Sequence, residues 1–162
     1  MSLQLTATLR TGVVTPFTVS FYYGPAPNGT SQQGIDEPNF IGSIPVIPMP
    51  LKNTTGTSYN QLPLSPVLAN GLNSNAINSL DESEIVPLLT EKLSWVVVDT
   101  NGNVLDIQEV IDKGGLTITV AARDVEPLQN GQENAFPQYS DWQEYDEPTQ
   151  GKPGGVRNCG CY

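Results

Sequence analysis

The last five residues, Asn158–Tyr162, contain both cysteines of the chain, Cys159 and Cys161. A Cys-x-Cys pair can bind a soft metal ion such as Cu(I) transiently, or can join two chains through disulfides. Two thiols make an incomplete zinc site, and the chain has no histidine to complete it. Three interpretations of the pair therefore stay open: mobile thiols without a role, a disulfide between subunits, and transient binding of Cu(I).

Histidine is absent from the whole sequence. Paired copper sites and Ser–His or Cys–His nucleophile systems all need imidazole groups. Carboxylates can hydrolyse glycosides in pairs, but only at a defined separation in space, which a sequence does not give. The acidic segments also lack the alternating Asp/Asn pattern and the central glycine of a calcium loop. We therefore expect no catalytic residues, no intrinsic cofactor and no enzyme activity.

The chain is strongly acidic: seventeen acidic residues against seven basic ones give a net charge of −10. Such a surface repels nucleic-acid phosphates and anionic membranes. No apolar run approaches the roughly 20 residues of a membrane span, and the N-terminus alternates like a strand rather than like a leader. We expect a cytoplasmic protein or a part of a longer precursor, with neither nucleic acid nor membrane as a partner.

Alternating apolar residues indicate six strands, separated by turns that use many of the 14 prolines and 15 glycines. The expected strands are Leu3–Arg10, Phe17–Tyr23, Phe40–Ile47, Trp95–Asp99, Val104–Gln108 and Leu116–Ala122. Residues 24–37, 48–60 and 70–79 are expected to be loops. This pattern predicts an all-β domain over residues 1–124, an antiparallel β-sandwich of six to seven strands with one short helix.

The helix is expected after Leu80. Asp81 and Glu84 stand at capping-box spacing, and an apolar face follows at helical spacing, made of Ile85, Leu88 and Leu89. Pro87 would stand past the first turn, so the helix either starts nearer Glu84 or kinks at Pro87. Further on, Asn101-Gly102 is the residue pair that a type I′ hairpin turn prefers.

Residues 125–162 are polar and acidic and are expected to form an extended tail. Aromatic residues recur at every third position within it: Phe136, Tyr139, Trp142 and Tyr145. A period of three fits a polyproline-like ribbon that lays one aromatic edge along a surface. That surface is either the chain's own sandwich or a partner, which can be a neighbouring copy. Gly151–Gly155 is expected to be a flexible spacer.

Five short segments, in their order and spacing, resemble the C-terminal domain of fungal tyrosinases, which follows the copper-binding catalytic domain. The segments are Phe17–Gly24, Glu37–Val46, Leu62–Leu68, Asp81–Trp95 and Leu116–Ala122, and the resemblance covers about residues 3–125. It implies the same β-sandwich, in a non-catalytic domain that covers a di-copper site, keeps the enzyme latent and assists copper loading. The partner that it implies is a tyrosinase catalytic domain.

In that family an apolar side chain projects into the copper pocket from a strand and the loop after it. The matching region here is Ile44–Leu51, in which the resemblance implies Ile47 and Met49 as plug residues, held by neighbouring prolines. Some relatives carry a Cys-x-x-Cys pair for copper delivery in the same loop, where this chain has no cysteine. Cys159 and Cys161 match that pair in residue type but not in position.

Two other functions stay open. A chain with an aromatic tail and terminal cysteines is suited to self-assembly, with the tail bound to a neighbouring copy and Cys159 or Cys161 locking the contact. A carbohydrate-binding module would instead use exposed aromatic residues, for which the candidates are Tyr22, Tyr23 and Trp142.

Overall fold

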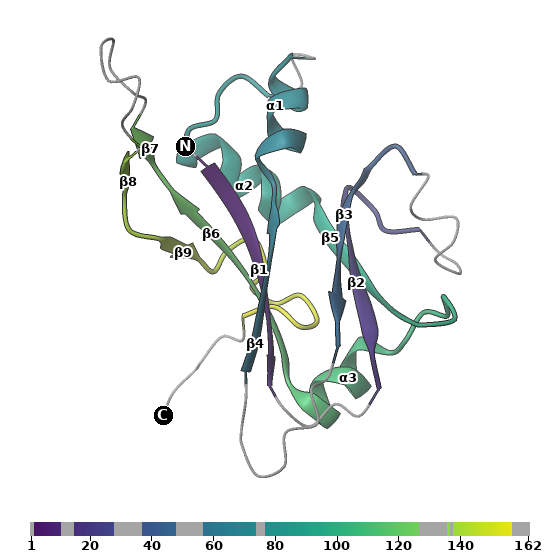
Figure 1. The fold of residues 1–162 in the computed structure, drawn as a ribbon. Helices are drawn as coiled ribbons and strands as arrows, with labels where there is room; N and C mark the ends of the chain where they lie inside the picture. The colour runs from purple at the N-terminus through teal and green to yellow at the C-terminus, as the bar shows by residue number, and fades with distance from the viewer. Residues whose placement is uncertain are drawn as a thin grey trace.

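The computed structural model describes residues 2–10, 15–27, 37–47, 57–73, 77–126, 136 and 138–156. These residues form nine strands and three helices (Figure 1). All pairings between the strands are antiparallel. The mainly-β fold of antiparallel strands that the sequence predicts is therefore confirmed, although two further helices accompany it. None of the helices in the described residues is both long and apolar enough to cross a lipid bilayer.

Two sheets make up most of the fold (Figure 1). The four-stranded sheet contains, in order, β4 (Thr57–Pro63), β1 (Ser2–Arg10), β6 (Leu116–Arg123) and β9 (Gln143–Tyr145). The three-stranded sheet contains, in order, β3 (Phe40–Val46), β2 (Phe17–Tyr23) and β5 (Leu93–Asp99). A small ribbon is formed by β7 (Val125–Glu126) and β8 (Gln138–Tyr139).

Side chains from both sheets pack into one hydrophobic core. From β2, Phe17, Val19 and Phe21 point into it, and from β6, Ile118 and Val120 do so; each is at most 3% exposed. Successive side chains of a strand point to opposite faces, so every second residue reaches the core. The helices add further buried residues, among them Leu68, Ile85 and Leu89.

β3 is an edge strand of the three-stranded sheet. Its Pro45 lies opposite Thr18 in the register with β2. Proline has no backbone N–H, and within sheets it is found on edge strands. Gly42 of the same strand lies close to the other sheet, since a Cβ there would be 2.8 Å from Leu62 Cδ1 of β4. The missing side chain lets β3 and β4 approach each other.

α2 (Glu82–Lys92) begins directly after Asp81 and runs through Pro87. The alternative of a late start near Glu84 is therefore wrong. The predicted capping box is also wrong, because the Asp81 side chain makes no capping hydrogen bond. The backbone carbonyl oxygen of Asp81 instead accepts hydrogen bonds from the N–H groups of Glu84 and Ile85, each at 3.0 Å.

The turn at Asn101-Gly102 is longer than predicted. The Gly102 N–H donates to the Asp99 carbonyl oxygen at 3.1 Å, and the Asp99 N–H donates to the Asn103 carbonyl oxygen at 2.9 Å. These bonds enclose a three-residue loop rather than a two-residue type I′ turn. The Asp99 carboxylate accepts from the N–H groups of Asn101 and Asn103, at 2.8 Å each, and so stabilises the longer loop.

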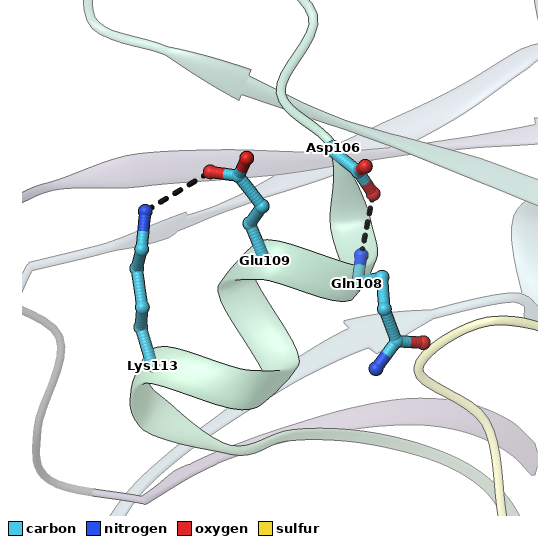
Figure 2. A network of polar contacts seen from close by, with 4 residues as sticks. All are labelled: Asp106, Gln108, Glu109 and Lys113. Carbon is cyan, nitrogen blue, oxygen red and sulfur yellow. Dashed lines mark hydrogen bonds and ion pairs between the residues drawn. The ribbon is translucent and has the colours of Figure 1, made fainter.

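The predicted strand Val104–Gln108 is wrong. Val104 forms one isolated bridge with Val98, and α3 (Ile107–Gly114) begins three residues later. The Asp106 carboxylate caps this helix by accepting from the Gln108 N–H at 2.8 Å, as Figure 2 shows. A side-chain acceptor at the N-cap satisfies an N–H that has no partner within the helix. The Lys113–Glu109 ion pair, 3.0 Å long, adds a contact one turn along (Figure 2).

The sequence does not predict α1 (Ser65–Asn73), because Pro66 and the Asn-Gly pair after it are typical of loops. Pro66 stands in the first turn, where a helix does not need its N–H. Gly71 lies against Ile77, whose Cδ1 would be 2.7 Å from a Cβ at that position. Glycine therefore lets Ile77 pack on the helix, where it is 6% exposed.

The expected loop at residues 48–60 gives way to β4 from Thr57 onward. Its sequence, TSYNQLP, has little apolar alternation, so the periodicity of the chain does not reveal it. Pairing with β1, from Arg10 opposite Thr57 to Gln4 opposite Pro63, holds it in place.

Residues 138–156, which we call the tail segment, run along the outer edge of β6. β8 pairs with β7 just after β6 ends, β9 pairs with residues 120–122, and Gly155 forms a bridge with Ile118. The tail segment therefore supplies the fourth strand of the four-stranded sheet, β9. Gly151–Gly155 forms hydrogen-bonded turns, so the expected flexible spacer is wrong.

The tail segment also contacts the other sheet. The Trp95 indole Nε1 donates to the Pro153 carbonyl oxygen at 2.8 Å. Lys152 Nζ donates to the Leu93 carbonyl oxygen at 2.7 Å, beyond the last turn of α2, where free carbonyls favour a positive charge. Burial lowers the pKa of Lys152. These contacts join β5 and α2 to the chain that follows β6.

Candidate interaction sites

Ile47 directly follows β3 and is 72% exposed. Ile44 and Val46, before it, point into the core and are 3% and 1% exposed. Pro45 stands between them and fixes the backbone φ at that position. A large aliphatic side chain thus projects from a firmly packed strand end and can contact another molecule. Met49 lies outside the described residues.

The four aromatic residues of the tail do not form one exposed edge. Their exposed fractions fall along the chain, from 90% for Phe136 through 52% for Tyr139 and 37% for Trp142 to 7% for Tyr145. Tyr145 lies in the core because β9 brings it beside Val120. The three other rings are the ones that can contact a partner, and their docking role stays a prediction.

Arg123, at the end of β6, lies over two of these rings. Its guanidinium carbon is 4.1 Å from the centroid of Tyr139 and 4.4 Å from that of Trp142. A guanidinium group is attracted to the negative face of an aromatic ring. Among the described residues no hydrogen-bond partner is found for its buried Nε atom.

A small polar cavity of about 80 Å³ lies beside this stack. Three carboxylates line it, from Glu82, Asp124 and Asp141, together with Ser140 and Tyr145. Burial, a hydrogen bond to Glu82 and the charges of Glu82, Asp124 and Glu147 raise the pKa of Tyr145 to about 12. Three carboxylates and the guanidinium group of Arg123 thus lie at this end of the four-stranded sheet.

The remaining candidate residues do not gather at a site. Tyr22 is 1% exposed and packs edge-on against Phe40 with ring centroids 5.6 Å apart, so it is not the exposed sugar platform that we expect from the sequence. Tyr23 is half-buried. Cys159 and Cys161 lie outside the described residues. Within the described residues, no cluster of three or more His, Cys, Asp or Glu side chains could hold a metal ion.

We compared the sequence and the fold of this chain with those of known proteins. The sequence-family model of the tyrosinase C-terminal domain matches residues 7–120 of this chain. The chain belongs to the tyrosinase C-terminal domain family. Recombinant mushroom tyrosinase has a similar fold, with a TM-score of 0.63 and 21% sequence identity, over 90% of this chain and 24% of that one. Among curated proteins, no sequence matches.

The tyrosinase C-terminal domain is a non-catalytic accessory domain of tyrosinases, and this chain spans 24% of the length of the mushroom enzyme that it resembles. The family match includes β3 and Ile47, the strand end from which the sequence predicts a plug. It ends within β6, so Arg123 and the tail segment lie beyond it.

Sequence reasoning missed Arg123 and Asp124, and it considered Glu82 only as one of many carboxylates. Glu82 lies in the first turn of α2, Arg123 ends β6 and Asp124 follows it, and charged residues at such places are usual and carry no functional signal. Only the return of the tail segment along β6 brings them together, and that return has no periodic pattern in the sequence.

Proposed function

We propose that this chain acts as a shielding domain, which covers the di-copper site of a tyrosinase catalytic domain and keeps that enzyme latent. Membership of the tyrosinase C-terminal domain family supports the type of partner. The observation that carries the proposal is the 72% exposure of Ile47 at the end of β3. A side chain of this size loses about 1.5–3 kcal/mol of burial free energy when it stays in water, so it favours an apolar pocket.

In this role the chain performs no chemistry. Ile47, and Met49 after it, would enter the mouth of the copper pocket and exclude phenolic substrate by occupying its space. The core packing of Ile44 and Val46 would hold the strand end rigid, so that little conformational entropy is lost on binding. A role in copper loading would fall to Cys159 and Cys161, whose thiolates suit Cu(I).

The test uses a tyrosinase catalytic domain prepared without its own C-terminal domain. Adding this chain should inhibit diphenol oxidation with increasing dose. Ile47→Asp should weaken the inhibition at least about tenfold, because a carboxylate would have to be buried in place of an aliphatic group. Val104→Asp, which places the same charge at another exposed aliphatic residue, is the matched control and should inhibit like the wild type. Equal inhibition by the Ile47 variant and the wild type would contradict the proposed plug.

A further inference from the structure

Two rings that already hold one guanidinium group form an exposed surface next to three carboxylates. We propose that this surface binds an arginine-rich segment of a partner protein. We call it the aromatic–acidic surface and define it by Arg123, the rings of Tyr139 and Trp142, and the carboxylates of Glu82, Asp124 and Asp141.

The first argument comes from the rings. Arg123 lies over both Tyr139 and Trp142, at 4.1 and 4.4 Å, yet the two residues remain 52% and 37% exposed. Their geometry therefore suits a guanidinium group, and ring area is left over for a second one. Arginine stacks on aromatic rings through its planar, weakly hydrated guanidinium, whereas lysine offers a compact and strongly hydrated charge.

The second argument comes from charge. Glu82, Asp124 and Asp141 line the adjoining cavity, and Arg123 is the one cationic residue in that lining. The two ion pairs found among the described residues, Lys92–Glu91 and Lys113–Glu109, involve none of these groups. The carboxylates are thus not neutralised by an ion pair within the described part of the chain, and a cationic partner would complement them.

Charge also decides between possible occupants. A second copy of this chain would bring the same carboxylates face to face, and each copy carries a net charge of −10. Like charges brought together at an interface oppose association. Self-assembly through these rings is therefore less favourable than binding of a basic segment from another protein.

The aromatic–acidic surface is separate from the proposed plug. β7 and β8 lie at the upper left of Figure 1 with β9 below them, whereas β3 runs downwards on the other side of the molecule and ends in its lower half. The inference does not rest on the shielding role, and either function can fail without the other.

The experiment compares two labelled octapeptides of equal charge, one alternating arginine with glycine and the other alternating lysine with glycine. Fluorescence anisotropy at moderate salt should show the arginine peptide binding about fivefold more tightly, because only arginine gains from stacking. Tyr139→Leu and Trp142→Leu should each remove this preference. Asp141→Asn should weaken both peptides equally, and Val104→Ser, which is not part of the surface, should change neither.

Equal affinity for the two peptides would overturn the proposal, since charge alone would then explain the binding. An arginine preference that survives both ring substitutions would overturn it as well. Circular dichroism of each variant checks the fold, and Tyr139, the more exposed ring, provides the variant less prone to unfold. Sedimentation of the free protein covers the remaining outcome: dimers that dissociate in the Tyr139 variant would assign the surface to a second copy instead.

Discussion

Tyr145 shows how a single residue joins the tail segment to the rest of the domain. Its ring is part of the hydrophobic core, while its hydroxyl group hydrogen-bonds Glu82 in the first turn of α2. Burial and the nearby negative charges both disfavour the tyrosinate form. The residue is therefore most stabilising while its hydroxyl stays protonated.

This coupling makes the stability of the domain sensitive to high pH. The pKa of Tyr145 is about 12 in the folded protein, against an ordinary value of 10.0. Below pH 10 the hydroxyl is protonated in both states, and its contribution to the free energy of unfolding is constant. Between pH 10 and 12 the unfolded chain ionises first, so stability falls as pH rises. Urea unfolding should show a smaller decline over this window for Tyr145→Phe than for the wild type.

At neutral pH the same variant should lose about 1–2 kcal/mol of stability, because Glu82 loses its hydrogen-bond donor. Glu82→Gln is the matched control: it keeps a hydrogen-bond acceptor but removes the charge. Tyrosinate absorbance should then show a pKa for Tyr145 closer to its ordinary value. Identical pH profiles for Tyr145→Phe and the wild type would show that another group causes the alkaline decline.

At the scale of elements, the turns at residues 146–156 determine how the tail segment closes against β6. Thr149 is fully buried there, and its carbonyl oxygen lies where a side chain on Gly155 would have to go. Gly154, next to it, has a positive φ of 80°, and its carbonyl oxygen accepts from the Ile118 N–H at 2.8 Å. The two glycines thus allow the chain to turn tightly and still reach β6.

These turns need glycine for two reasons, a close backbone contact at Gly155 and a positive φ at Gly151, and alanine substitutions at the two positions separate them. A Cβ at Gly155 would be 1.9 Å from the Thr149 carbonyl oxygen, so the backbone must move, and we expect a loss of about 2–4 kcal/mol. At Gly151 no atom lies within 4 Å of such a Cβ, and only the positive φ of 75° opposes the change. Gly151→Ala should therefore cost about 1–2 kcal/mol. Chemical denaturation measures both values, and equal losses would mean that the close contact is relieved without cost.

The sequence predicts the elements whose own residues decide their structure. β2 has the bounds Phe17–Tyr23 that its alternation indicates, and α2 follows from the apolar spacing of Ile85 and Leu89. β4 and β9 are held instead by pairing with distant strands, and their polar sequences give no periodic signal. Ile47 is indicated only by the family resemblance, and the stacking of Arg123 with Tyr139, which the tail segment creates, is not indicated at all.

At the scale of the whole molecule, the domain is completed by residues beyond the family match. β9 extends the four-stranded sheet past β6, and Trp95 and Lys152 bond the tail segment to the rest of the chain. A boundary at residue 124 would separate Tyr145 from the core to which it belongs. The tail segment therefore contributes to the folded unit.

A chain that ends at residue 137 should consequently be much less stable than the full chain. It would lose the burial of Tyr145, worth about 3–5 kcal/mol by analogy with large-to-small core substitutions, and it would expose the edge of β6. Thermal unfolding should show a lower Tm, and light scattering should show larger particles. A synthetic peptide of residues 138–156, added in excess, should reverse both effects. An unchanged Tm in the shortened chain would show that the tail segment is dispensable.

Pro45 also affects whether strands of other chains can add to the edge of β3. An open sheet edge is a template on which further strands can add, and repeated addition leads to fibrils. Any strand that added to β3 would turn it into a central strand with a proline as its second-last residue, whereas prolines within sheets are found mainly on edge strands. Pro45, two positions before the exposed Ile47, thus also disfavours amyloid-like growth from this edge. A domain that must keep an apolar side chain in water can in this way remain dispersed at high concentration.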